Sequence, residues 1–326
     1  MSEARVAAPV PVLSDFAGQG ALYDGMIRTL KDGTFVHAYL ISGSQGMGKR
    51  TLARLMAQYL LCTGENKPCG VCPACRQVLD ANHPDVLTVA PGKPLSPDVK
   101  AGLQGIPVDE IRHVISLAGQ HTFTGGDRVI IIERADTMNP PAQNALLKTL
   151  EEPIAGTVFL LLTDSPELLL PTIVSRCRAM KLHPWPDDVV LRALKAHGVA
   201  PDMAQKALSV CGGSIGQALR LLEKGLPKYA KLAADFVDSL GASPLRIMEV
   251  CLAASALTRS EYGDFYTECT RKLTEAALRE PQYARYYVAV YEYIQQQKDK
   301  LTDNNGSVFA LSSQLAAFCG TINRSK

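Results

Sequence analysis

The stretch GSQGMGKRT, residues 43–51, has nearly the pattern of a phosphate-binding loop, which is G-x-x-x-x-G-K followed by Ser or Thr. Gly43, Gly48 and Lys49 fit this pattern, and Gly46 is a further residue without a side chain. Glycines let backbone N–H groups approach phosphate oxygens, and the N-terminus of a following helix adds positive potential. Lys49 would reach the terminal phosphates of ATP or ADP. The loop therefore indicates P-loop ancestry.

The residue after the lysine departs from the pattern. It normally gives a hydroxyl to Mg²⁺, but here it is Arg50, which cannot ligate a cation. Thr51 lies one residue further along the predicted helix, about 100° round its axis, so it should not replace that ligand cleanly. The loop leaves nucleotide binding open and argues against efficient Mg²⁺-dependent hydrolysis. A glycine-rich turn that binds nothing is the alternative interpretation.

A second departure follows the buried apolar run at residues 128–133, RVIIIE. P-loop ATPases carry an Asp for Mg²⁺ at the end of such a strand, and many have a Glu beside it that activates water. Here Glu133 takes the first position and Arg134 the second. A guanidinium stays protonated, so Arg134 cannot act as a general base. Two losses of the same chemistry favour an inactive ATPase over a surface pair of charges at a strand end.

Cysteines are concentrated in one short segment with the spacing C-x₆-C-x₂-C-x₂-C. Four thiolates this close can bind Zn²⁺ tetrahedrally and leave no open position for catalysis, so the predicted role is structural. Free thiols and an iron–sulfur cluster are the alternatives. The predicted ligands are Cys62, Cys69, Cys72 and Cys75. The other five cysteines are interpreted as buried apolar residues: Cys177, Cys211, Cys251, Cys269 and Cys319.

Alternating strands and helices must position these groups. Strands are predicted at residues 37–42, 85–90, 128–133 and 157–163. Helices are predicted at residues 49–61, 106–120 and 139–153, the last with Asn139 as its N-cap and Pro140 at its first position. This order predicts an α/β fold with a mostly parallel sheet and helices on both sides.

Strand signals fade after about residue 180, and the remaining chain is predicted to be helical. Three domains are expected, at residues 1–180, 181–225 and 226–326. The segment HPWPDD, residues 183–188, is predicted to be a linker, with Trp185 as a packing anchor.

Composition bounds the function. Hydrophobic residues make up 47% and charged residues 20% of the chain, as in ordinary globular proteins. The net charge of +2 does not favour a protein that binds nucleic acid alone. No apolar run approaches the roughly 20 residues that span a bilayer, and the proline-broken N-terminus is a poor signal peptide. We therefore expect a cytoplasmic protein without a membrane partner.

These motifs together resemble the clamp-loader ATPases of bacterial DNA polymerase III, which are AAA+ proteins. The resemblance rests on HAYLISGSQGMGKRTLARLMAQYLLC, the Cys₄ segment, NHPDV, NALLKTLEEP and SRCRAMKL, which cover most of residues 15–182. It implies a RecA-like AAA+ P-loop domain at residues 1–180 with a zinc module inserted at residues 62–75. It also implies a small helical lid domain at residues 181–225 and an all-helical oligomerisation collar at residues 226–326.

The resemblance also implies roles for single residues. Arg50 and Arg134 would make this chain an ATPase-deficient subunit rather than the hydrolysing gamma/tau subunit, and Gly216 stands where an active subunit has its sensor-2 arginine. Thr163 would be the sensor-1 residue. Arg176, in the SRC motif, would be an arginine finger that acts in trans on the neighbouring subunit's ATP. Its alternative role is a helix-end arginine paired with a local carboxylate.

The implied partners are gamma/tau and delta subunits in a hetero-pentameric ring, a sliding clamp, and primer-template DNA contacted through the assembled complex. Two other functions remain open. The first is an active gamma/tau-type ATPase in which Glu133 holds Mg²⁺ and Thr51 assists. The second is a standalone zinc-containing nucleic-acid-binding protein, against which the net charge of +2 argues.

Overall fold

The computed structural model of the chain describes residues 11–224, 228–302 and 307–321. The chain divides into two compact units, residues 1–219 and 220–326. The predicted domain boundary at residues 225 and 226 lies outside the described residues, as do residues 1–10, on which much of the signal-peptide expectation rests.

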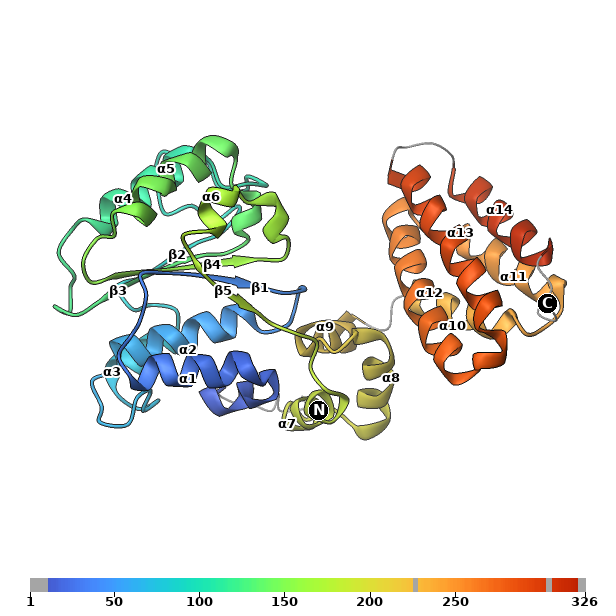
Figure 1. The fold of residues 1–326 in the computed structure, drawn as a ribbon, viewed down its shortest axis with the longest axis horizontal. Coiled ribbons are helices and arrows are strands. Elements are labelled where there is room, and N and C mark those ends of the chain that lie inside the picture. Colours follow the sequence, from blue (N-terminus) through green and yellow to red (C-terminus); the bar gives the residue numbers. More distant parts are fainter. Residues whose placement is uncertain (1–10, 225–227, 303–306, 322–326) are drawn as a thin grey trace, which may run out of the picture. The chain divides into compact units, whose positions relative to one another are not determined.

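The first unit is built on a five-stranded parallel sheet in the order β2-β3-β4-β1-β5 (Figure 1). The strands are β1 (Ala38–Ser42), β2 (Val86–Val89), β3 (Arg128–Ile132), β4 (Thr157–Thr163) and β5 (Arg178–Lys181). The first four confirm the predicted strands. The fifth was missed, because three of its four side chains are exposed and its sequence has no buried apolar run.

Helices cover both faces of this sheet, as predicted (Figure 1). Side chains that alternate along β1, β3 and β4, such as Leu40, Ile130 and Leu161, pack in one apolar cluster with Ile111 of α4 and Leu146 of α5. The opposite face is covered by α1, α2 and α3. The helices are α1 (Ala21–Lys31), α2 (Lys49–Leu61), α3 (Pro73–Leu79), α4 (Val108–Ala118), α5 (Pro140–Glu151) and α6 (Pro171–Val174), with short 3-10 turns at Leu13–Gln19, Ala135–Thr137 and Pro166–Leu168.

Helix α5 begins as the sequence predicts. The Asn139 side chain accepts a hydrogen bond of 2.9 Å from the Ala142 N–H, and Pro140 takes the first helical position. Gln143 then ties the helix to the chain that leads into α6, because its amide donates to Leu168 O and accepts from the Leu170 N–H. The start and the orientation of α5 are therefore fixed by polar contacts as well as by its apolar face.

The remaining described helices follow the sheet along the chain. They are α7 (Asp187–Ala196), α8 (Pro201–Cys211), α9 (Ile215–Lys224), α10 (Lys228–Ser239), α11 (Pro244–Ala254), α12 (Arg259–Arg279), α13 (Ala284–Thr302) and α14 (Val308–Thr321), with a 3-10 turn at Pro281–Tyr283. Helices α10 to α14 form the second unit around a core that includes Phe236, Phe265 and Leu315. Within that core, the Ser312 hydroxyl donates to the Tyr262 hydroxyl at 2.8 Å.

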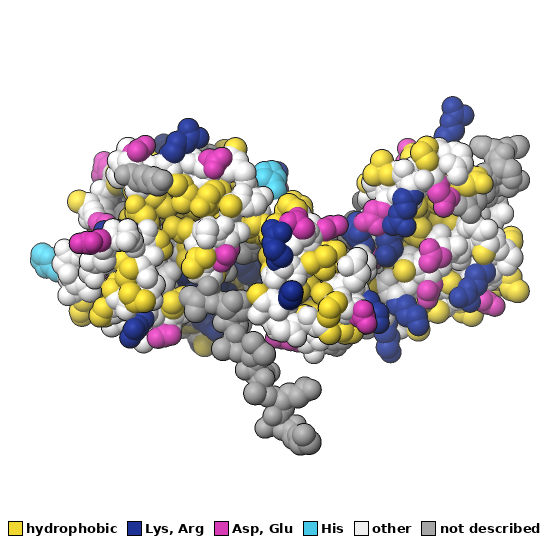
Figure 2. Space-filling view, turned by 90° about the horizontal axis from the view of Figure 1, so that it is seen from below, with side chains coloured by type: hydrophobic (Ala, Val, Ile, Leu, Met, Phe, Trp, Pro, Cys, Tyr) yellow, Lys and Arg dark blue, Asp and Glu magenta, His cyan; other side chains and the backbone are white. Residues whose placement is uncertain are grey.

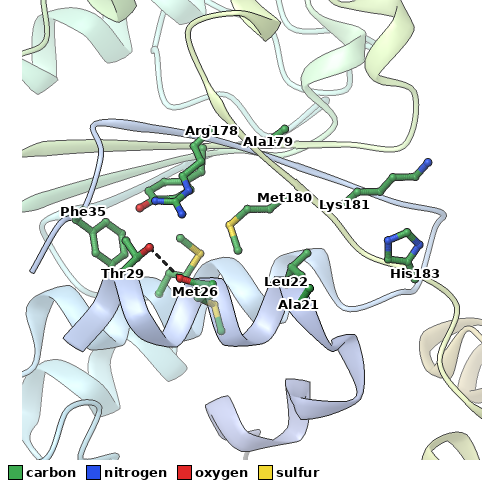
Figure 3. Close-up of a pocket in the computed structure, with 13 residues that line it drawn as sticks. Ala21, Leu22, Met26, Thr29, Phe35, Arg178, Ala179, Met180, Lys181 and His183 are labelled. Carbon is green, nitrogen blue, oxygen red and sulfur yellow. Dashed lines mark hydrogen bonds between the residues drawn. The ribbon is translucent and has the colours of Figure 1, made fainter. Parts of the chain in front are cut away.

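Two surface features complete the description. On the face drawn in Figure 2, Lys and Arg side chains are interspersed with Asp and Glu side chains in both units, so this face has no large patch of one sign. A cavity of 310 Å³ opens between α1 and the edge strand β5 (Figure 3). None of the helices in the described ranges is long and apolar enough to cross a membrane.

Candidate functional site

The glycine loop joins β1 to α2 in a conformation that needs glycine. Gly43, Gly46 and Gly48 have φ values of 148°, 82° and 99°, where residues with side chains are strained. A Cβ on Gly43 would lie 2.9 Å from Leu182 O, closer than side-chain carbons approach. Helix α2 starts at Lys49, directly after the loop, with Gly48 as its N-cap. The local geometry of a phosphate-binding loop is therefore present.

The Lys49 ammonium is committed to protein groups. It donates to Gly43 O at 2.5 Å and to Ser44 O at 3.0 Å, and it pairs with Asp164 Oδ1 at 2.5 Å. An ammonium has three N–H donors, and these three partners use them all. A phosphate group would have to displace Asp164 to reach this lysine.

Arg50 and Glu133, the two departures from the ATPase pattern, form an ion pair with each other. The Glu133 side chain is 11% exposed, whereas the Arg50 side chain is 62% exposed and reaches across to it. Glu133 stands at the end of β3, where the carboxylate that holds Mg²⁺ is expected. In this chain the Arg50 guanidinium neutralises that carboxylate, so the positive charge beside Glu133 comes from a side chain. Thr51, half-buried, follows in the first turn of α2.

Thr163 at the end of β4 is fully buried, and its hydroxyl is also engaged. It donates to Asp136 Oδ1 at 2.8 Å and accepts from the Ser165 N–H at 3.0 Å. Arg134, by contrast, has an exposed side chain and a left-handed backbone with φ of 52°. The ends of β3 and β4 are thus linked by Asp136, while Arg134 points into solvent.

Three consecutive carbonyl groups of the loop are held from outside by residues 185–216. Trp185 Nε1 donates to Met47 O at 3.0 Å, Ser214 Oγ to Gln45 O at 2.9 Å, and the Gly216 N–H to Gly46 O at 3.0 Å. We call Trp185, Ser214 and Gly216 the loop clasp. Trp185 is 5% exposed and packs edge-on against Phe16, which confirms its predicted role as a packing anchor. The clasp thus restrains the shape of the loop through three hydrogen bonds from the same chain.

Gly216 has a steric reason to lack a side chain. A Cβ at this position would lie 2.9 Å from both Cα and O of Gly46. A sensor-2 arginine could enter here only if the start of α9 moved away from the loop. The close contact through which Gly216 takes part in the loop clasp therefore also excludes an arginine at this position.

We expect Gly216→Ala to destabilise the first unit by about 1–3 kcal/mol, because an added methyl group overpacks a backbone contact. Trp185 is the single tryptophan of the chain, so its fluorescence during urea unfolding reports on the clasp. Gly25→Ala in α1 is the matched control, since a Cβ there meets nothing within 4 Å. Equal urea midpoints for Gly216→Ala and Gly25→Ala would contradict the close contact between Gly216 and Gly46.

Arg176 lies just after α6 and makes only local contacts among the described residues. Its guanidinium pairs with Glu151 Oε1 at 2.6 Å and donates to Thr172 O at 3.0 Å. This is the local pairing that the sequence left open as the alternative to an arginine finger. The two side chains are 34% and 49% exposed, and such a pair is worth roughly 0–1 kcal/mol. Arg176 can therefore leave Glu151 at little cost.

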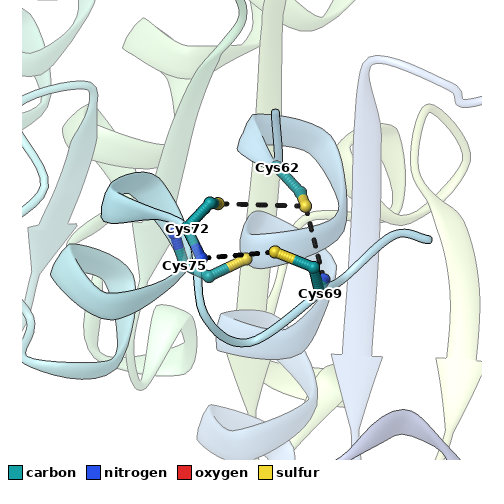
Figure 4. Close-up of side chains that lie close together, drawn as sticks. All are labelled: Cys62, Cys69, Cys72 and Cys75. Atoms are coloured by element: carbon teal, nitrogen blue, oxygen red, sulfur yellow. Dashed lines mark hydrogen bonds between the residues drawn. The ribbon is translucent and has the colours of Figure 1, made fainter. Parts of the chain in front are cut away.

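The four clustered cysteines converge, as Figure 4 shows, and all are free of disulfides. Their Sγ atoms lie within 4.8 Å of one another. A tetrahedral ion with metal–sulfur bonds of about 2.3 Å places its sulfurs about 3.8 Å apart, so the cluster has nearly the size of a metal centre. Cys62 caps α2, and Cys72 caps α3 with Cys75 in its first turn. The four residues fit a metal ion.

Backbone N–H groups surround these sulfurs. Cys62 Sγ accepts from the N–H groups of Gly64 and Cys69, at 3.4 and 3.3 Å. The N–H groups of Val71 and Cys72 lower the pKa of the Cys69 thiol. Burial raises the pKa of Cys72, but hydrogen bonds from the Cys75 and Thr63 N–H groups outweigh it and lower that pKa to about 5. Burial instead raises the pKa of the Cys75 thiol to about 12. The surroundings thus favour the thiolate, the form that binds metal, at Cys69 and Cys72 but not at Cys75.

Several residues of the site were not predicted from the sequence. Asp164 and Asp136 engage Lys49 and Thr163, and Glu151 engages Arg176. Asp164 directly follows one predicted strand, and Asp136 lies three residues after another. The ends of adjacent parallel strands meet at one edge of a sheet, so that position was an available signal. No local pattern marks Ser214, because it reaches the loop from a different part of the chain.

Comparisons with known proteins agree on one family. The family described as DNA polymerase III, delta subunit, matches residues 18–186, just over half of the chain. A DNA polymerase III subunit delta′ from Pseudomonas aeruginosa is 36% identical over 64% of this chain and 64% of its own. The Escherichia coli subunit delta′ is 36% identical over 62% of this chain and 59% of its own. The Salmonella typhimurium subunit tau is 31% identical over 65% of this chain and 33% of its own. The matches thus span less than two thirds of the length of these two delta′ relatives.

Proposed function

Because the chain belongs to the DNA polymerase III delta subunit family, we propose that it is the delta prime-type subunit of a bacterial replicative clamp loader. In this proposal it does not hydrolyse ATP itself. It completes a ring with gamma/tau and delta subunits and presents Arg176 to the ATP of its neighbour. The assembled ring would then load a sliding clamp onto primed DNA.

The ion pair between Arg50 and Glu133 is the observation that carries the proposal. An ATPase of this class needs a divalent cation to neutralise the phosphates and the carboxylate at the strand end. Here the carboxylate already faces a guanidinium that is part of the chain. The Lys49–Asp164 pair and the loop clasp act in the same direction, because both satisfy the loop without a ligand.

The exposure of Arg176 and the weakness of its local pair support the role proposed for it. Its side chain is 34% exposed and held by a weak local pair, so it could leave Glu151 to reach a phosphate on another chain. A planar guanidinium forms bidentate hydrogen bonds with phosphate oxygens and stabilises the charge that develops during phosphoryl transfer.

The remaining assignments complete the proposal. Helices α7 to α9 would be the lid domain, and α10 to α14 the collar through which the ring assembles. The four cysteines would hold one Zn²⁺, which stabilises the short segment between α2 and α3 and supplies no chemistry to the reaction. DNA and clamp would be contacted through the assembled complex, in the cytoplasm.

A cation test separates this subunit from an active gamma/tau-type ATPase. Fluorescent ADP should bind the wild-type chain weakly, with no gain on adding Mg²⁺, because Arg50 occupies the Glu133 carboxylate. Arg50→Ser frees that carboxylate and restores the hydroxyl, so Mg²⁺ should strengthen its binding by about 10-fold, equal to about 1.4 kcal/mol. Titrations with Mg²⁺ and with EDTA measure the difference.

Arg54→Ser, one turn along α2, is the control for loss of a positive charge. Strong Mg²⁺ dependence in the wild type, with turnover abolished by Lys49→Ala, would instead establish the active ATPase.

A further inference from the structure

The cavity between α1 and β5 lies on the opposite side of the sheet from α5, whose last residue holds Arg176 (Figure 1). Its walls are mainly apolar and come from α1, from Phe35 and Tyr39, and from Met180 of β5. In Figure 3, Arg178 and Met180 point from β5 toward α1. The Thr29 hydroxyl on the wall is already satisfied, since it donates to Gly25 O at 2.9 Å. The cavity has room for one or two large apolar side chains.

Positive charge surrounds the opening. Arg178, Lys181 and His183 line the cavity and are all exposed. Within the described ranges of the chain, none of the three takes part in an ion pair. Arg50 and Arg176 each have a carboxylate partner, whereas the carboxylates of the described residues do not neutralise this group of cations. Its charge complements a ligand that carries carboxylates.

The strand beside the cavity has a free edge. Among the described strands, β5 pairs with β1 alone and is the last strand of the sheet. The Leu182 N–H donates to Ser42 O at 2.8 Å, so the alternation of a strand turns the N–H and C=O groups of Ala179 and Lys181 away from β1. Both residues are exposed. Such an edge can pair with an added strand.

A glycine keeps the cavity open. Gly25 stands in the middle of α1, where glycine is unfavourable for a helix, and it lines the cavity. A Cβ at this position would meet nothing within 4 Å, and its backbone does not require glycine. Neither packing nor backbone conformation therefore prevents a larger residue at position 25. Its side chain would extend into the cavity and fill part of it.

We propose that this cavity and the free edge of β5 bind an extended segment of a partner protein. The segment adds a strand to the sheet and inserts a large apolar side chain beside Met180, while acidic residues on either side of it pair with Arg178 and Lys181. This site is separate from the ATP chemistry assigned to Arg176 and goes beyond the ring function proposed above.

The test uses a fluorescein-labelled peptide of alternating Glu and Phe residues, titrated into the full chain and followed by anisotropy. We expect saturable binding that weakens at least 10-fold when Gln replaces Glu or Ala replaces Phe in the peptide. Gly25→Leu fills the cavity and Ala179→Pro removes an outward N–H, so each should weaken binding by a similar factor. Arg178→Glu with Lys181→Glu should do the same.

Lys195→Glu with Lys206→Glu is the matched control, because both lysines are exposed on α7 and α8 and the change in net charge is the same. It should leave binding unchanged. Circular dichroism verifies that each variant is folded. The proposal is overturned if no saturable binding occurs, if Gly25→Leu binds as the wild type does, or if the two charge reversals act equally. It is also overturned if the cavity variants block ring assembly, since the occupant would then be a ring subunit.

Discussion

Arg176→Ala is expected to abolish the stimulation that this chain gives to ATP hydrolysis by the gamma/tau-type subunits of a reconstituted ring. Arginine fingers are worth about 10³–10⁵ in rate where they have been measured, so turnover at the neighbouring site should fall by about 10³-fold or more. The measurement is DNA-stimulated phosphate release by the cognate assembly in the presence of clamp and primed DNA. Sizing chromatography verifies that the variant enters the same complex.

Two further variants separate a finger from a structural arginine. Glu151→Gln breaks the local pair but keeps the guanidinium, so a finger should retain its stimulation, whereas a purely structural arginine should lose it. Arg176→Lys keeps the charge but not the planar fork and should recover only part of the rate. If Arg176→Ala and wild type stimulate equally in intact rings, the finger assignment is wrong and this chain is at most a scaffold.

Removal of the metal is expected to have the largest effect on local folding. Structural Zn²⁺ contributes about 10–16 kcal/mol of apparent binding free energy in small zinc peptides at neutral pH. A strong chelator, or Cys72→Ser, should therefore unfold the segment between the end of α2 and the end of α3. Amide hydrogen exchange should show loss of protection over residues 62–79 with the parallel sheet retained. Elemental analysis should find one zinc per wild-type chain.

Cys177→Ser is the control, because Cys177 is buried in the core on the other face of the sheet and should not affect the metal content. Iron in place of zinc, with visible absorption, would establish the iron–sulfur alternative. A chain that purifies without metal and keeps full protection over residues 62–79 would show that four free thiols suffice.

The sequence predicted the elements that are buried on both sides. Strands β1, β3 and β4 are continuous apolar runs, and the boundaries of α5 follow from Asn139 and Pro140. Edge strand β5 was missed, since its Arg178 and Lys181 face solvent and only Met180 is buried. Helix α3 was missed as well, because its start is set by Cys72 within a segment interpreted only as metal ligands. The other edge strand, β2, was predicted because its sequence is largely apolar. A local pattern therefore finds an edge strand only where that strand keeps apolar residues.

The same limit applies to the candidate site. Arg50 and Glu133 were each identified as a departure from the ATPase pattern, but their pairing depends on how α2 lies over the end of β3. Gly216 was noted for the arginine it replaces, while its contact with Gly46 emerges only when α9 is placed on the loop. The sequence identified residue types that argue against ATP hydrolysis. Only the fold shows the groups that these residues contact instead, Glu133 for Arg50 and Gly46 for Gly216.

The cation in the Arg50–Glu133 pair is covalently part of the chain, so it cannot be exchanged or diluted. We therefore expect the conformation of this subunit to be insensitive to the ATP-to-ADP ratio of the cell, whereas its ring neighbours would follow that ratio. A growing cell and a starving cell would then contain the same form of this subunit. In such a ring the conformation of one subunit would stay the same while the conformations of the others change with bound nucleotide.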